Sequence, residues 1–266
     1  MGITITATCE GKSKSIECRR PSFKEVRKEY DKINTANPND ENLQEAFRQG
    51  IVDNGIWRGK TEKISKNTAE NIIQSIKDGQ YDDNVWQRYA LVGGKPLSEY
   101  INYKDFFRFG YVYQDYGNTC ALQVSYALNY GGMPLHTEIK VKEYNSMYGR
   151  GEKYLYILGA DYMGRYLNDK WGKAEVAIEP KSNDERKLTF NNLQGNTGIA
   201  VIKGRHFINQ KFSSNFSHTT LWNTNDFVDV QNKTNYNYLL ELIWNDSFGN
   251  THIYHSSNFQ FWELKD

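Results

Sequence analysis

The sequence predicts an α+β fold in which helices come first and an antiparallel sheet follows. Before Gly195, apolar residues recur mostly at helical spacing, whereas after it they alternate with polar residues, the period of a half-buried strand. Hydrophobic residues make up 38% of the chain and charged residues 24%, shares that allow a packed core. Its 266 residues exceed one small domain without demanding two large ones, so we predict a single domain over residues 1–266.

The first twenty residues are expected to form a strand pair, with strands Thr4–Cys9 and Ser15–Cys18 joined by a turn at Gly11-Lys12-Ser13. In such a hairpin Cys9 and Cys18 are close enough to form a disulfide in an oxidising compartment, and in a cytosol they stay thiols. The sequence leaves both possibilities open. With three cysteines in the chain, at least one is unpaired, and Cys120 is the one left over.

Helices are expected where apolar residues share one face. A helix is predicted to begin at Ser22, after Pro21. The apolar stripes of the first helices are Phe23, Val26 and Tyr30; Leu43, Phe47 and Ile51; and Ala69, Ile72 and Ile76. Further along, Asn118-Thr119 is a good helix start and Gly131-Gly132 a good stop, and another helix is expected over Ala160–Trp171.

The strands of the predicted sheet lie in the last third of the chain. The period of two covers Gly198–Lys203, Ser217–Asn223, Tyr238–Trp244 and His252–Phe259. Asn245–Asn250 is rich in turn formers and is expected to join the last two strands.

Charge and hydropathy exclude several classes of function. The net charge is +1, from 33 basic against 32 acidic residues, so no strong attraction to nucleic acid or to an anionic membrane follows. No apolar run approaches the ~20 residues of a membrane helix. The N-terminus alternates apolar and polar residues and lacks the apolar stretch of a secretory signal, so export would use a route without a cleavable signal.

Cys120 lies where a thiol nucleophile would be expected. The thiolate is the attacking species, and a position at the first turn of a helix favours an anion by about 0.3–1 kcal/mol. Cys120 directly follows Asn118-Thr119, and its backbone N–H could donate to a developing oxyanion. A cysteine buried for structural reasons fits the same pattern.

A catalytic thiol also needs a histidine from elsewhere in the chain. Of the five histidines, His218 shares a strand face with Thr220 and Trp222, and Asp226 and Asp229 follow as groups that could orient its ring. Two other histidines, His252 and His255, are three residues apart on a predicted strand. The two therefore point to opposite faces, and we expect structural roles for them rather than shared metal binding.

Beyond these patterns, the chain resembles the fourth family of type VI secretion amidase effectors. The run Asn118–Asn129, followed by Gly132-Met133-Pro134-Leu135, resembles the family's nucleophile helix. Other resembling blocks follow in order from about Arg20 to the end of the chain: Arg20-Pro21-Ser22-Phe23, Val92-Gly93-Gly94-Lys95, Lys153–Lys173, Gly198–Ile202, Ser217–Asn223 and Phe261-Trp262-Glu263-Leu264.

The resemblance implies a papain-like fold of the cell-wall amidase type, with the nucleophile helix packed on an antiparallel sheet. It implies hydrolysis of the γ-D-glutamyl–diaminopimelate amide in peptidoglycan stem peptides, without a metal or other cofactor. It also implies delivery by a type VI secretion system into the periplasm of a target cell. Partners would then be components of that system and a cognate immunity protein, with no nucleic acid and no membrane insertion.

For the catalytic residues, the resemblance implies a triad of Cys120, His218 and an aspartate some way past the histidine, for which Asp229 is preferred to Asp226. The chain departs from the family pattern in having Ser217 before the histidine, where glycine is usual. Residues 36–85 look like a helical insertion, and residues 1–19 form an N-terminal extension outside the resemblance.

Two other functions remain open from the sequence. A different papain-fold thiol activity, such as protein deamidation or transamidation, would use the same three residues. Alternatively, the chain is a noncatalytic module whose aromatic surfaces bind cell-wall glycan, and a buried, unreactive Cys120 is what that function predicts.

Overall fold

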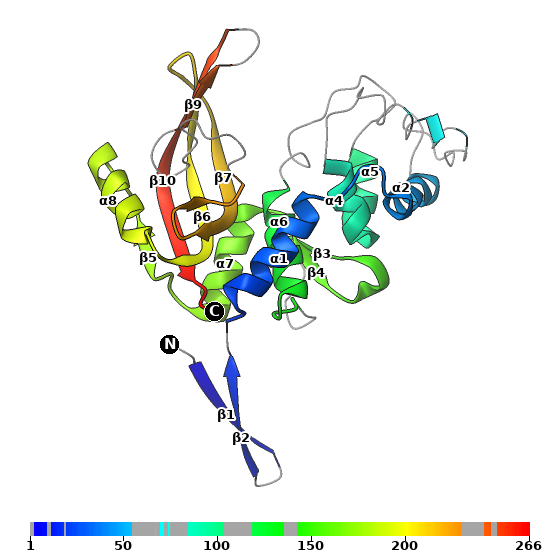
Figure 1. The fold of residues 1–266 in the computed structure, drawn as a ribbon, viewed down its shortest axis with the longest axis horizontal. Helices are drawn as coiled ribbons and strands as arrows, with labels where there is room; N and C mark the ends of the chain where they lie inside the picture. Colours follow the sequence, from blue (N-terminus) through cyan, green and yellow to red (C-terminus); the bar gives the residue numbers. More distant parts are fainter. Residues whose placement is uncertain are drawn as a thin grey trace. The chain divides into compact units, whose positions relative to one another are not determined.

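The computed structural model describes residues 3–9, 12–18, 20–54, 67, 70–71, 74, 85–103, 119–135, 143–229, 242–245 and 249–266 (Figure 1). Contacts divide the chain into two compact units. We call the first, Met1–Val26, Gly131–Met133 and Ala160–Asp266, the sheet unit. The second, Arg27–Tyr130 and Pro134–Gly159, is the helical unit.

The sheet unit is built on a 6-stranded antiparallel sheet with the order β5-β10-β6-β7-β8, in which β9 also pairs with β10. Its strands are β5 (Val176–Ile178), β6 (Thr197–Ile208), β7 (Lys211–Asn223), β8 (Asp226–Phe227), β9 (Leu242–Asn245) and β10 (Thr251–Glu263). The predicted α+β class and the predicted antiparallel sheet are confirmed. The long strands β6, β7 and β10 extend beyond their predicted ends because their pairing continues past the alternating segments.

Helix α7 (Ala160–Trp171), which has the predicted bounds, packs against β6 and β7. A Cβ added at its Gly164 would lie 3.2 Å from Val201 Cγ1. Helix α8 (Asn183–Leu193) instead contributes Leu193 to a core that includes Ala200 and Ile202 of β6. Because successive side chains of a strand alternate, α7 and α8 cover different faces of the sheet.

Helix α8 was not predicted, although its start carries a sequence signal. Ser182 is the N-cap, and its hydroxyl accepts a hydrogen bond from the Glu185 N–H at 3.2 Å. The Ser182-Asn183-Asp184-Glu185 sequence is thus the S/T-x-x-E pattern that opens many helices. Its apolar stripe is weak, which is why periodicity alone overlooked it.

The N-terminal hairpin consists of β1 (Ile3–Cys9) and β2 (Lys12–Cys18). Lys12 and Ser13 already belong to β2, so the predicted turn at Gly11-Lys12-Ser13 is wrong for these two residues. Cys9 pairs with Lys12 near the turn, whereas Cys18 pairs with Ile3 at the opposite end of the hairpin. That places the two cysteines roughly 20 Å apart along the strands, beyond the Cα separation of about 7 Å that a disulfide allows. The register therefore rules out a Cys9–Cys18 disulfide within the hairpin.

Helix α1 (Phe23–Asn34) begins in the sheet unit and continues into the helical unit. The rest of the helical unit comprises α2 (Glu41–Asn54), α4 (Val85–Val92), α5 (Gly94–Tyr103), α6 (Cys120–Tyr130), β3 (Ser146–Tyr148), a 3₁₀ turn η1 (Arg150–Glu152) and β4 (Leu155–Ile157). Its core is aromatic, with Tyr89 and Tyr100 stacked at 4.3 Å between ring centroids and Phe47 beside Trp86.

The predicted helical stripes agree with α1 and α2, whose Phe23, Val26, Tyr30, Leu43 and Phe47 are buried. The third stripe, Ala69, Ile72 and Ile76, lies outside the described residues, although residues 67, 70, 71 and 74 are helical. Residues 104–118 and 230–241 also lie outside them.

Helix α6 is buried on all sides rather than on one apolar face, since every residue from Cys120 to Asn129 is buried. Its polar side chains bond to β4 and to the segment that follows the helix. Ser125 Oγ accepts from the Ile157 N–H at 2.9 Å, and Asn129 Nδ2 donates to the Leu155 carbonyl at 2.8 Å. These bonds fix α6 against the β3–β4 pair.

Candidate active site

The structure places Cys120 at the first position of α6, as predicted. Thr119 precedes it as the N-cap, because the Thr119 carbonyl accepts the first helical bond from the Gln123 N–H at 2.9 Å. The N–H groups of the first turn have no acceptor within the helix, so this end favours negative charge. The Cys120 residue is 4% exposed. Asn118 lies outside the described residues.

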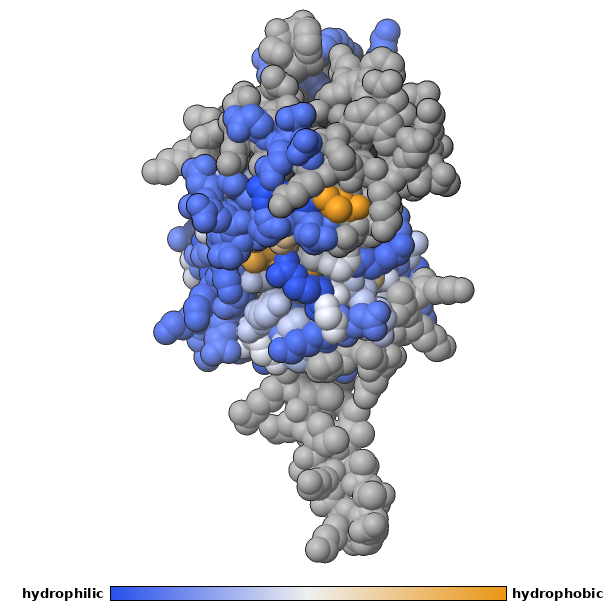
Figure 2. All heavy atoms as spheres, turned by 90° about the vertical axis from the view of Figure 1, so that its right-hand side faces the viewer, coloured by the Kyte–Doolittle hydropathy of each residue, from blue (hydrophilic) through white to orange (hydrophobic). Residues whose placement is uncertain are grey.

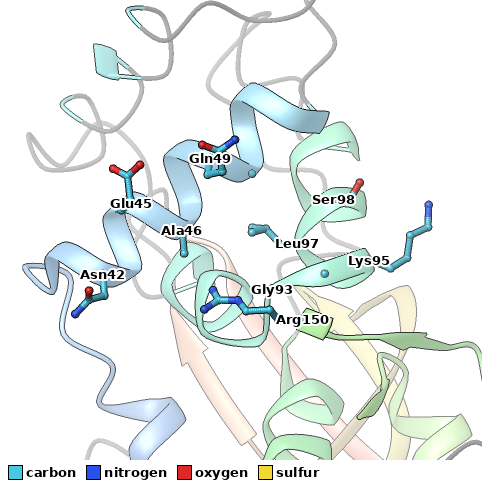
Figure 3. A pocket seen from close by; sticks show the side chains of 11 residues that line it. Asn42, Glu45, Ala46, Gln49, Gly93, Lys95, Leu97, Ser98 and Arg150 are labelled. Carbon is cyan, nitrogen blue, oxygen red and sulfur yellow. The ribbon is translucent and has the colours of Figure 1, made fainter. Parts of the chain in front are cut away.

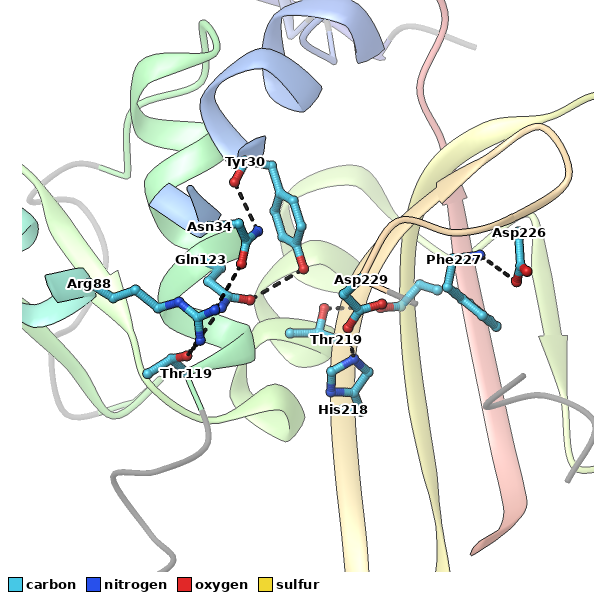
Figure 4. Close-up of polar contacts among 11 residues, drawn as sticks. Tyr30, Asn34, Arg88, Thr119, Gln123, His218, Thr219, Asp226, Phe227 and Asp229 are labelled. Carbon is cyan, nitrogen blue, oxygen red and sulfur yellow. Dashed lines mark hydrogen bonds and ion pairs between the residues drawn. The ribbon is translucent and has the colours of Figure 1, made fainter. Parts of the chain in front are cut away.

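A polar cluster of the helical unit lies behind this helix start (Figure 4). Arg88 Nη1 donates to Thr119 Oγ1 at 2.6 Å, and Arg88 Nη2 donates to Asn34 Oδ1 at 3.2 Å. The Gln123 amide fits its neighbours when its oxygen lies 2.7 Å from Arg88 Nη1 and its nitrogen donates to the Tyr30 hydroxyl at 3.3 Å. Sequence reasoning did not identify Arg88, which precedes Thr119 by 31 residues and belongs to no motif.

In the sheet unit, the two remaining residues of the expected triad lie together (Figure 4). His218 Nε2 is 2.7 Å from Asp229 Oδ2, and the two side chains are 15% and 17% exposed. The hairpin from β7 to β8 causes this contact. Trp222 pairs with Phe227, and the Val228 N–H donates to the Leu221 carbonyl, so the returning chain brings Asp229 back along β7 toward His218.

The electrostatics of this pair fix the histidine tautomer. Burial opposes ionisation of Asp229, but attraction to His218 and hydrogen bonds from His218 and Thr220 outweigh it, so the pKa of the Asp229 carboxyl lies below its usual value. An ionised carboxylate only accepts hydrogen bonds, so His218 Nε2 carries the hydrogen. In the neutral ring, Nδ1 then holds the lone pair that a general base needs.

Asp226, the other aspartate considered, lies at the hairpin end. It pairs with Asn223, and its Oδ1 accepts from the Phe227 N–H at 2.8 Å. Desolvation, reinforced by the charge of Asp229, raises the pKa of Asp226 despite that hydrogen bond. The two carboxyl groups are thus tuned in opposite directions, and Asp229 is the one that contacts His218.

A pocket of about 860 Å³ lies within the helical unit (Figure 3). One side is a helical stripe of α2, and the other is the turn between α4 and α5 together with Arg150 of η1. The Arg150 Nη2 group donates to the Ala90 carbonyl at 3.1 Å, so this arginine also holds the end of α4. The lining includes Asn42, Glu45, Gln49, Lys95 and Ser98 beside apolar groups such as Leu97, so it mixes polar and apolar surface.

A second histidine cluster lies at the far end of β6 and β10. His206 Nε2 and His252 Nδ1 are 3.0 Å apart, and the His206 ring stacks on Tyr254 at 4.2 Å. Desolvation and the neighbouring His252 lower the pKa of His206. Among the described residues, no group of three or more His, Cys, Asp or Glu side chains could hold a metal ion. His255 instead lies edge-on to Phe207, away from this pair, as the opposite-face prediction requires.

The coloured residues on the face shown in Figure 2 are mostly hydrophilic, and hydrophobic atoms are exposed there only in small patches. None of the helices in the described part of the chain has the length and apolar character needed to span a membrane.

Comparison with known proteins gives a family match over residues 116–260, to the family described as type VI secretion system amidase effector protein 4, Tae4. Similar solved structures include the Tae4–Tai4 effector–immunity complex from Enterobacter cloacae, at 19% identity and a TM-score of 0.45, covering 93% of this chain and 100% of that chain. Another is the Tae4–Tai4 effector–immunity system from Salmonella typhimurium, at 18% identity and a TM-score of 0.43, covering 92% and 99%. Among the curated proteins, none matches this chain.

Proposed function

Because this chain belongs to the family of type VI secretion amidase effectors named Tae4, whose match spans more than half of it, we propose that Cys120, His218 and Asp229 carry its amidase reaction. The chain is an amidase effector of a type VI secretion system, and its family acts on peptidoglycan. All three residues fall inside the matched segment, residues 116–260.

The bond proposed for cleavage is the γ-D-glutamyl–diaminopimelate amide of the stem peptide. His218 Nδ1 accepts the thiol proton of Cys120, and the thiolate attacks the γ-carbonyl carbon. The Cys120 N–H, in the first turn of α6, donates to the oxyanion. Protonated His218 then gives its proton to the leaving diaminopimelate amine, and a thioester remains on Cys120.

Water completes the cycle. With His218 again as base, a water molecule attacks the thioester carbonyl, releasing the D-glutamyl γ-carboxylate and restoring the Cys120 thiol. Asp229 holds the imidazole through Nε2 and stabilises its protonated form. The chain contributes the side chains of Cys120, His218 and Asp229 and the Cys120 N–H to these steps.

The single observation that carries the proposal is the His218–Asp229 bond. It orders the His218 ring through Nε2 with an ionised carboxylate, so that the lone pair of the neutral ring lies on Nδ1, on a strand within the family match. The cysteine is buried, which the noncatalytic alternative also predicts, so thiol reactivity distinguishes the two functions better than exposure does.

We further propose that the protein acts in the periplasm of the target cell and that a cognate immunity protein inhibits it. The solved relatives include effectors in complex with Tai4 immunity proteins, which supports such a partner for this chain. The single amidase domain, with residues 36–85 as an insertion and residues 1–19 as an extension, is part of the same proposal.

The test is digestion of purified sacculi by the wild-type chain and by Cys120→Ala, with released fragments identified by mass spectrometry. We expect the wild type to expose new diaminopimelate amines and the variant to release none while keeping the wild-type circular dichroism spectrum. Cleavage by Cys120→Ala at the wild-type rate would refute the mechanism. Loss of glutamine amide nitrogen from added proteins, with intact sacculi, would instead point to a deamidase.

A further inference from the structure

We propose that Arg88 is a positioning residue for the nucleophile, acting through the N-cap of α6. This inference rests on the proposed function, because it takes Cys120 as the attacking group. It assigns a role in the reaction to a residue of α4 that lies outside the family match and outside every motif of the sequence.

The geometry begins with the guanidinium group. Arg88 Nη1 reaches Thr119 Oγ1 at 2.6 Å and Nη2 reaches Asn34 Oδ1 at 3.2 Å, so one planar group links α4, α1 and the start of α6 (Figure 4). In the amide orientation that satisfies its neighbours, the Gln123 oxygen, one turn into α6, lies 2.7 Å from the same Nη1 atom. Arginine suits this task because its donors are held in a rigid fork.

The bonded hydroxyl belongs to the residue directly before the nucleophile. An N-cap threonine commonly uses its hydroxyl to accept a backbone N–H of its own helix, whereas the Thr119 hydroxyl here accepts from Arg88. The orientation of the Thr119–Cys120 peptide is therefore set from outside the helix. That peptide carries the Cys120 N–H proposed for the oxyanion, and misplacement by about 1 Å is enough to lower a rate on the order of a hundredfold.

The positive charge of Arg88 and the dipole of α6 both favour negative charge at the start of this helix. The Arg88 guanidinium group lies against the Thr119 hydroxyl and the Asn34 and Gln123 side-chain oxygens. A guanidinium stays charged at every working pH. Positive charge at the N-terminus of α6 stabilises the negative charge that develops on the sulfur and then on the carbonyl oxygen.

The first experiment measures kcat and KM of Arg88→Gln on a soluble muropeptide. We expect kcat to fall about 10- to 100-fold with KM changed less than about threefold, because the lost interaction acts on the transition state. The matched control is Arg27→Gln, which removes another arginine of the helical unit that bonds Asp31 on the surface of α1. We expect the control to keep wild-type kcat. A kcat for Arg88→Gln within twofold of wild type would overturn the inference.

A second pair of variants breaks the same bond from its other end and keeps Arg88. Thr119→Val removes the hydroxyl, and Thr119→Ser retains it. We expect Thr119→Val to lower kcat like Arg88→Gln and Thr119→Ser to keep it within about threefold, with the double variant Arg88→Gln/Thr119→Val no worse than either single one. Fully additive losses, or equal losses for Val and Ser, would overturn the role through Thr119.

Chemical rescue separates positioning from stability. Added guanidinium ion should restore part of the kcat of Arg88→Ala by filling the vacated site, and it should not stimulate Thr119→Val. Because guanidinium weakens folded proteins, such a gain cannot come from stabilisation. No rescue of a folded Arg88→Ala at any subdenaturing concentration would count against the inference.

A parallel assay of Cys120→Ser separates this inference from the proposed function. Activity of Cys120→Ser at the wild-type level would refute the proposed function itself. An inactive Cys120→Ser together with a fully active Arg88→Gln would refute only the role of Arg88.

Discussion

His218 and Asp229 meet because the chain reverses between β7 and β8. The Nε2–Oδ2 distance is 2.7 Å, although the two residues are eleven positions apart in the sequence. Thr224, in the turn, adopts a left-handed conformation with φ of 54°, and the returning chain pairs Phe227 with Trp222. A tight hairpin thereby holds the base, on β7, beside its orienting carboxylate, which lies just after β8.

The two nearby aspartates provide a matched test of this arrangement. We expect Asp229→Asn to lower kcat about 10²- to 10⁴-fold, because an amide neither stabilises the protonated imidazole nor enforces the tautomer with the lone pair on Nδ1. Asp226→Asn removes a carboxylate three residues away that bonds the Phe227 N–H, and we expect an effect below about threefold. The measurement is muropeptide cleavage by both variants. Equal losses would mean that His218 is not oriented through Asp229.

The lowered pKa of Asp229 predicts how stability depends on pH. A carboxyl whose folded pKa is depressed stabilises the fold above its unfolded pKa, near 3.9, and loses that contribution as the pH falls through the folded value. The unfolding free energies of wild type and Asp229→Asn should therefore differ at about pH 5, on the order of 1–3 kcal/mol, and the gap should shrink as the pH falls through the folded pKa of Asp229. Urea denaturation across this range measures the difference. A gap that widens toward acid would contradict the assignment.

The turn between α4 and α5 requires glycine at position 94. Its φ is +59°, and an added Cβ would lie 2.4 Å from the Gly149 carbonyl carbon. Gly94→Ala combines a strained backbone with a backbone clash, so we expect it to lower the unfolding free energy by about 3 kcal/mol or more.

Gly151→Ala is the control, because its φ of +66° is similar while no atom lies within 4 Å of the added Cβ. We expect it to cost about 1–2 kcal/mol, from the backbone conformation alone. Urea unfolding curves of the two variants give the comparison. Equal destabilisation would show that the contact with Gly149 is relieved by movement of the chain.

Ser125 holds α6 against β4 through a buried hydroxyl. Its Oγ accepts from the Ile157 N–H at 2.9 Å and lies 3.2 Å from the Ile157 carbonyl oxygen. Ser125→Ala leaves that N–H without its partner in the interior, and we expect a loss of about 1–3 kcal/mol in unfolding free energy. Ser182→Ala, at the exposed N-cap of α8, should cost about 1 kcal/mol. A smaller loss for Ser125→Ala than for Ser182→Ala would contradict this role of the hydroxyl.

The sequence determined those elements whose causes are local. The stripe of Phe23, Val26 and Tyr30 predicted α1, and the Asn118-Thr119 start with its glycine stop predicted α6. Alternation predicted β6, β7 and β10, because a period of two reports a half-buried strand wherever it occurs. The motifs around Cys120 and His218 indicated the family, which the match over residues 116–260 confirmed.

Only the tertiary structure decided which residues distant in the sequence touch. Two aspartates follow His218 at similar spacing, and the register of the β7–β8 hairpin is what brings Asp229 to the ring. Cys9 and Cys18 belong to one hairpin, yet its register holds them at opposite ends. Arg88 reaches Thr119 across 31 residues with no motif to mark it. Periodicity reports the face on which a side chain lies, whereas register and helix packing, which arise from contacts between elements, decide its partner.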